Sequence, residues 1–155
     1  QLVHGATAAE PSPWYGKQPA DGSGLSAVLG GLLPPDGPRA DVTFIDHNGQ
    51  HWRAEEWLPA GLRHAPRLAD PLDLRHPADG WGDIGAATGL LLTALATAEL
   101  CHPWASPGHK AQGQTALVAC AAQLGPERAG VLLHRPPPPE ARQTTRPPLS
   151  TGDAA

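Results

Sequence analysis

The segment Gly82–Leu100, GDIGAATGLLLTALATAEL, decides the fold class of this 155-residue chain. After Asp83, apolar residues recur at helical spacing and no further charge follows until Glu99. This pattern is typical of a helix that is apolar nearly all round and therefore buried. Asp83 suits the N-cap or the first turn, because a carboxylate there accepts hydrogen bonds from unpaired backbone amides. The small residues within 85–89 would let another backbone approach closely. The sequence therefore predicts a central buried helix over about 84–98.

Segments with strand and helix patterns flank this helix. Residues 41–46, DVTFID, are rich in β-branched and aromatic side chains and run into the turn 47–49, which predicts a strand. Residues 115–122 and 129–134 predict two more strands, joined by a hairpin-length connection. A helix is expected over 23–33, because leucines and a valine recur at helical spacing until two prolines stop the run. This mixture indicates the α/β class with a mixed sheet.

Prolines and glycines, 37 residues together, mark the connections and the ends of the chain. Residues 50–62 predict a short helix interrupted near Pro59, because proline removes an amide donor. Residues 63–82 are expected to form a long polar connection. The domain organisation predicted is an arm or linker over 1–22, one folded unit over 23–135, and a disordered Pro-rich tail over 136–155.

Charge and apolar length exclude several classes of function. The formal charge is -4 with only 11 Lys and Arg, so the basic surface that nucleic acids require is not expected. The longest uncharged apolar stretch has 15 residues, below the roughly 20 that cross a bilayer. The N-terminal stretch has no secretory-signal pattern, so a cytoplasmic protein with no membrane contact is expected. The sequence starts at Gln1 and holds no Met, and we expect that an upstream part is missing.

The order of these elements resembles the C-terminal half of the thiolase-like fold, specifically the β-ketoacyl synthase relatives. In that family a strand of this half ends in a His-Gly-Thr-Gly-Thr loop, and a Gly-His-x-x-Gly-Ala-Ala-Gly segment later opens a buried helix. Residues 82–89, GDIGAATG, match the second pattern with Asp83 in place of the histidine. Residues 42–49 match the first loosely, with Asp46 or His47 near the histidine position. The resemblance covers about residues 23–135 and implies half of a layered thiolase-like fold.

The resemblance implies acyl-transfer chemistry, and its departures imply that this chemistry is lost. The family condenses acyl groups with a Cys nucleophile from the other half of the fold, while two imidazoles polarise the thioester oxygen. Asp46, His47 and Asp83 are the matching site positions here. An ionised carboxylate beside a developing oxyanion opposes the charge that the site must stabilise. We therefore expect a non-condensing, degenerate subunit or scaffold of fatty acid or polyketide biosynthesis.

Two alternatives stay open. The chain can be the C-terminal fragment of an active acyltransferase of the 3-oxoacyl carrier-protein synthase type, with an upstream Cys and with His47 polarising the thioester. It can also be a small independent binding module. The expected partners are the missing N-terminal half or a ketoacyl-synthase-like protein, an acyl carrier protein, or a second copy of the chain. No cofactor and no metal is expected.

Other candidate residues favour structural roles. Cys101 falls at the end of the apolar helix and Cys120 within a strand, so neither has the setting of a nucleophile. His47 and His51 have a metal-ligand spacing, but they start in a turn and need not converge.

Two adjacent glutamates and the five tryptophans allow two interpretations each. Glu55 and Glu56 are adjacent, so on a helix they point in different directions and form a poor acid/base pair. The five tryptophans fall in or beside predicted loops, where they suit packing or partner contacts. They are Trp14, Trp52, Trp57, Trp81 and Trp104.

Overall fold

A computed structural model describes residues 3–101 and 114–135 of the chain, so the tail predicted for 136–155 lies outside the described residues. The elements are, in order, β1 (Val3–Ala9), α1 (Ser23–Leu32), β2 (Val42–Ile45), α2 (His51–Arg63), β3 (Leu74–Arg75), α3 (Ala78–Trp81), α4 (Thr88–Cys101), β4 (Thr115–Ala121) and β5 (Glu127–His134). Short 3₁₀ turns lie at Ala65–Arg67 and Gly85–Ala87. No helix in this described part is both long and apolar enough to cross a bilayer.

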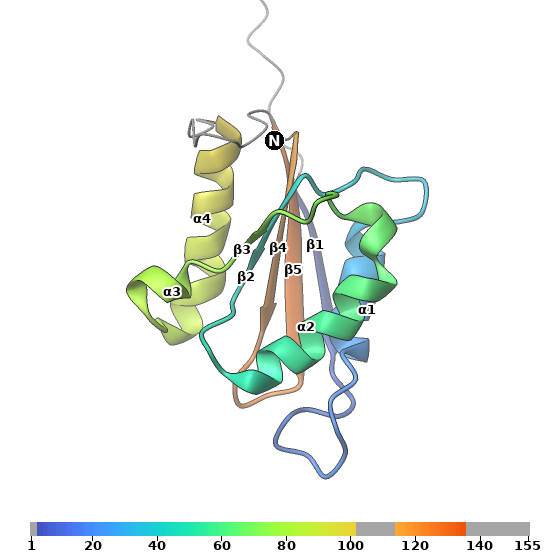
Figure 1. The fold of residues 1–155 in the computed structure, drawn as a ribbon, viewed down its shortest axis with the longest axis vertical. Helices are drawn as coiled ribbons and strands as arrows, with labels where there is room; N and C mark the ends of the chain where they lie inside the picture. The colour runs from blue at the N-terminus through green and yellow to red at the C-terminus, as the bar shows by residue number, and fades with distance from the viewer. Residues whose placement is uncertain (1–2, 102–113, 136–155) are drawn as a thin grey trace, which may run out of the picture.

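The five strands form one mixed sheet in the order β1-β5-β4-β2-β3 (Figure 1). β5 is antiparallel to both of its neighbours, β1 and β4. β2 is parallel to both of its neighbours, β4 and β3. The α/β class, the mixed sheet, the strand after residue 41 and the closing hairpin are therefore confirmed.

Helices cover both faces of the sheet, with α1 and α2 on one side and α4 on the other (Figure 1). Successive side chains of a strand point to opposite faces, so Ile45 packs with α1 while Phe44 packs with α4. The α1 side of the core holds Leu25, Val28, Leu29, Leu32, Leu117 and Leu132. The α4 side holds Leu92, Ala96, Leu100, Val118 and Leu133. Two apolar layers thus enclose the centre of the sheet.

The N-terminal segment differs from the loop or arm predicted for residues 1–22. Val3–Ala9 forms an edge strand, paired residue by residue with β5 from Val3 opposite Leu133 to Ala9 opposite Glu127. Small side chains of this strand, those of Ala6 and Ala8, pack against the α1 side of the core. The backbone pairing supplies the order that its residue types do not suggest.

The interruption predicted at Pro59 is also wrong, because α2 runs unbroken from His51 to Arg63. A proline inside a helix deprives the carbonyl four residues earlier of its donor. That residue is Glu55, whose side chain is exposed. Water can therefore replace the missing donor.

The helix predicted over 84–98 is shorter at its start and less buried than expected. A 3₁₀ turn with Gly85 at φ 62 precedes it, and α4 itself begins at Thr88. A left-handed residue cannot continue a right-handed helix, which explains the later start. Within the described residues, α4 is buried on one side only, and Leu90 on the other side is 77% exposed.

Candidate functional site

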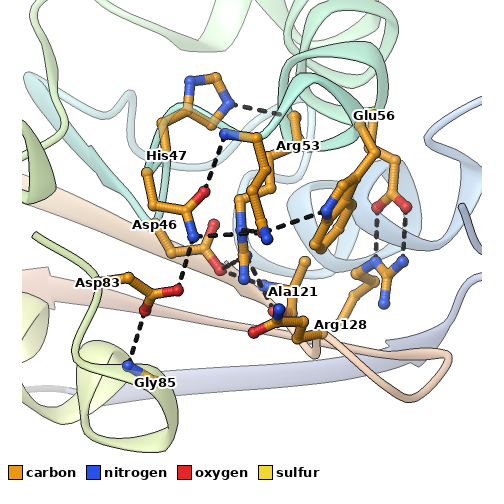
Figure 2. Close-up of polar contacts among 12 residues, drawn as sticks. Asp46, His47, Arg53, Glu56, Asp83, Gly85, Ala121 and Arg128 are labelled. Atoms are coloured by element: carbon orange, nitrogen blue, oxygen red, sulfur yellow. Dashed lines mark hydrogen bonds and ion pairs between the residues drawn. The ribbon is translucent and has the colours of Figure 1, made fainter.

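Asp46 is the first residue after β2 and its carboxylate is held by two groups. Oδ2 accepts a hydrogen bond of 2.8 Å from the Ala121 amide at the end of β4, and it forms an ion pair with Arg53 from the first turns of α2 (Figure 2). The two side chains are 11% and 7% exposed. Arg53 Nη1 also donates to the Ala121 carbonyl at 3.0 Å. The pair therefore joins β2, β4 and α2.

Arg53 is held by further contacts along its length. Its Nε donates to Gln50 Oε1 at 3.3 Å, and its guanidinium carbon lies 4.4 Å from the centre of the Trp52 ring. Burial raises the pKa of Asp46, while the Arg53 charge and the Ala121 amide act in the opposite direction. A carboxylate with these partners is positioned as a structural link and does not face an open site.

His47 follows Asp46 and is directed at the protein backbone. Its Nε2 lies 3.1 Å from the Arg53 carbonyl. Because a carbonyl only accepts, Nε2 carries the proton of this bond. Burial lowers the pKa of His47, so the ring is neutral at pH 7. The ring of His76 lies 6.4 Å away and forms its own pair with Asp79 at 2.7 Å.

Asp83 links the loop after β2 to the segment that precedes α4. Oδ2 accepts from Asn48 Nδ2 at 2.8 Å, and Oδ1 accepts from the Gly85 amide at 2.7 Å (Figure 2). The Gly85 bond and then the Asn48 bond lower the pKa of Asp83, which is fully exposed. The carboxylate accepts from a backbone amide as predicted, but in the turn before α4. Through Asn48 it is joined to the loop that carries Asp46 and His47.

Neither cysteine has the surroundings of a nucleophile. Burial, with a smaller contribution from the Asp46 charge, raises the pKa of Cys120 to about 12. Its Sγ packs against Gly89 of α4, where a Cβ would lie 3.4 Å from the sulfur. Cys101 is exposed at the last residue of α4, far along that helix from Asp83. The sequence indicates two small buried thiols; Cys120 is partly buried within β4, whereas this expectation is wrong for Cys101, which is exposed.

The space beside Asp46 is too small for an acyl group. It amounts to about 10 Å³ and is bounded by Asp46, His47, Arg53, Cys120 and the apolar side chains around them. A site of this volume lies at the lower limit for one water molecule. Binding of a substrate here would require Arg53 or the loop after β2 to move.

A second ion pair is fully buried and was missed from the sequence, and the guanidinium groups of both pairs lie near the Trp52 ring. Glu56 accepts from Arg128 Nε and Nη2, both at 2.6 Å, and the two side chains are 1% and 0% exposed. Glu55 instead points outward and pairs with His51 at 3.1 Å. A signal was present, because Glu56 lies four residues from both Trp52 and Ala60 and so falls on the buried face of α2.

The histidine spacing that could suit a metal is not used in that way. His51 contacts Glu55 and His47 contacts the Arg53 carbonyl, so the two rings do not converge. Across residues 3–101 and 114–135, no three His, Cys, Asp or Glu side chains are grouped so that they could hold an ion.

Comparisons with known proteins give no relative from which a role could be transferred. No family model matches the chain, and no curated protein or solved structure matches it.

Proposed function

We propose that this chain is a β-ketoacyl-synthase-like subunit of thiolase type that does not condense acyl groups and serves as a structural part of a larger assembly. Two segments carry the resemblance to that family, residues 42–49 and residues 82–89. The Asn48–Asp83 hydrogen bond of 2.8 Å joins them, as expected if both border one former site. The layered arrangement of α1 and α2 against α4 is compatible with half of such a fold.

The observation that carries the non-condensing role is the ion pair of Asp46 with Arg53. Condensation needs neutral donors aimed at an oxygen that becomes negative. Here Asp46 and Asp83 place carboxylates at or near the two matching positions, and Arg53 is already neutralised by Asp46. His47 donates its Nε2–H in a hydrogen bond to the Arg53 carbonyl. The His47 Nε2 donor and the Arg53 Nε and Nη1 donors are thus all engaged by acceptors of the protein itself.

The scaffold role is supported by the outer side of α4. No charged residue occurs from Thr88 to Ala98. The hydroxyls of Thr93 and Thr97 donate to carbonyls one turn back, each at 2.8 Å, so these donors are satisfied within the helix itself. A helix that is apolar all round is normally buried on every side.

The outer residues of α4 form one stripe opposite its buried side. They recur at helical spacing and are Leu90, Ala94, Thr97 and Cys101. A ketoacyl-synthase-like partner, the N-terminal half that such a fold requires, or a second copy would cover this stripe. An acyl carrier protein is the further partner that such an assembly would serve.

Intact-mass spectrometry after incubation with acyl-coenzyme A thioesters tests the non-condensing role. The wild-type chain is expected to keep its mass, because the pKa of about 12 leaves Cys120 as a thiol near pH 7. The variant Cys101→Ser shows which of the two thiols carries any adduct that forms. An acyl adduct that is stable on either cysteine would contradict the proposal.

An active enzyme is the second candidate, and the neutral imidazole of His47 favours it. In that case the nucleophilic Cys would lie upstream and His47 would have to release the Arg53 carbonyl to donate to a thioester oxygen. Reading the upstream coding sequence discriminates between the two. A Cys in a small-residue elbow between a strand and a helix would support the active enzyme.

A further inference from the structure

Trp14 and Tyr15 form an exposed aromatic pair at the tip of the loop between β1 and α1. A backbone hydrogen bond of 2.7 Å from the Gly16 amide to the Pro13 carbonyl closes a tight turn, and the two aromatic residues occupy its centre. Their rings meet edge to face with centres 5.8 Å apart, and the residues are 42% and 48% exposed. The turn therefore presents two adjacent rings to solvent.

This pair is seated rigidly on the protein. The Trp14 ring stacks on the buried Trp52 ring at 5.9 Å with an interplanar angle of 19°. Trp14 Nε1 donates to the Gln123 carbonyl in the β4–β5 turn at 2.8 Å. The next residue of that turn, Leu124, is 87% exposed. One ring face of Trp14 is thus fixed by the core, while its exposed part adjoins Tyr15 and lies beside the turn that carries Leu124.

The chemistry of this surface fits an extended proline-rich segment. Tryptophan and tyrosine rings on a rigid support bind such segments, because a polyproline helix loses little conformational entropy when it docks. The carboxylate of Glu127 lies over Gly125 in the same turn and supplies a negative charge at one side. A ligand with a basic residue next to its prolines would match both features.

We propose that the segment Arg146-Pro147-Pro148-Leu149 of this same chain docks on the Trp14–Tyr15 surface. It combines a basic residue with two prolines and an apolar residue. Arg146 would approach Glu127, and the prolines would lie against the two rings. This proposal does not depend on the acyl-transfer family.

Chain length selects this segment over the four prolines at 136–139. β5 carries the chain from the β4–β5 turn, which Trp14 contacts through Gln123, to the opposite end of the sheet (Figure 1). Its eight residues correspond to about 24 Å. An extended return over the four prolines would cover only about 12 Å, whereas the eleven residues from Pro136 to Arg146 would cover about 34 Å. Of the two proline runs, only Pro147-Pro148 is far enough along the chain to reach the rings.

Nuclear magnetic resonance of the full-length chain tests the docking. The Trp14 indole N–H signal, assigned by its loss in Trp14→Phe, is expected to shift in the variant Pro147→Ser/Pro148→Ser. The matched control Pro137→Ser/Pro138→Ser is expected to leave that signal in place. Conversely, Tyr15→Ala, which removes an exposed side chain, is expected to move the Leu149 amide to its position in the isolated peptide of residues 140–155.

Three results would overturn the proposal. The indole signal could stay in place when Pro147 and Pro148 are replaced. It could move equally in the control variant. The shift could also decrease on tenfold dilution, which would show that the segment comes from a second copy. An unchanged shift over that dilution supports docking within one chain.

Discussion

Replacing Arg128 by methionine should remove a large part of the stability of this domain. The side chain is fully buried, makes two bonds of 2.6 Å to Glu56, and donates to the Gly125 and Glu127 carbonyls at 3.1 and 2.9 Å. Arg128→Met leaves the Glu56 carboxylate buried and unpaired. Breaking a buried pair in this way costs about 3–5 kcal/mol, against about 5–15 kcal/mol for the total stability of a domain.

Urea denaturation of single and double variants measures this cost. Glu56→Met alone should cost a similar amount, because it leaves the Arg128 charge buried. The double variant Glu56→Met/Arg128→Met removes both charges, so its loss of unfolding free energy should be less than half of the sum of the single losses. As a control, Arg75→Met breaks the partly exposed pair with Asp73 and should cost less than about 1 kcal/mol.

The double variant decides whether the reasoning is right. If the two single losses add up in the double variant, the two side chains do not interact across the core as described. If Arg128→Met lowers the free energy of unfolding no more than Arg75→Met does, burial does not make the Glu56–Arg128 pair more important for stability than an exposed pair. Either result would refute the role given to this ion pair.

Three further predictions concern single residues. The lowered pKa of His47 means that the unfolded chain binds a proton more readily than the folded chain, so stability should fall as pH drops below about 6.5. In His47→Gln, which keeps a donor, the urea midpoint should fall less between pH 7 and pH 5. An equal fall of the midpoint in both proteins would contradict this. A maleimide at pH 7 should label Cys101 and spare Cys120. The pKa of Cys120 is about 12, against 9.0 for an ordinary thiol, which implies about a thousandfold less thiolate. Comparable labelling of the two cysteines in peptide mapping would count against the burial of Cys120. Gly22 and Gly49 both have positive φ, but of the two only Gly22 would place a Cβ against backbone, 2.2 Å from a carbonyl oxygen. Gly49→Ala should lower the free energy of unfolding by about 1 kcal/mol, and Gly22→Ala should lower it clearly more. Equal urea midpoints of the two variants would be inconsistent with the close approach at Gly22.

Helices and strands could be predicted where their apolar or β-branched side chains follow a recognisable helical or strand pattern. The β-branched run before Asp46 and the helical spacing after Ser23 located β2 and α1 within one residue. β1 could not be predicted, because its small residues show no alternation and its order comes from pairing with β5. The start of α4 was misplaced because the φ of Gly85 is a property of the turn and leaves no periodic signal.

The candidate site was predictable only in part, for a similar reason. The motif positions placed Asp83 near the loop after β2, and the Asn48 contact agrees with that neighbourhood. The partner of Asp46 depends on how α2 lies across the end of the sheet. The partner of Glu56 depends on a sheet order that brings β5 beside β4 and under α2. Contacts set by topology in this way are not encoded in local sequence patterns.

Sedimentation velocity of the purified chain tests most directly whether α4 packs on another subunit. The wild-type chain, when purified alone, should sediment as a dimer or larger species at about 100 μM, because the stripe of Leu90 and Ala94 would otherwise face water. Leu90→Glu/Ala94→Glu should sediment as a monomer, and Leu124→Glu, at a leucine on the β4–β5 turn that is also highly exposed, should behave like wild type. A wild-type monomer at that concentration, or self-association that the α4 variant leaves unchanged, would contradict the role of α4 in assembly.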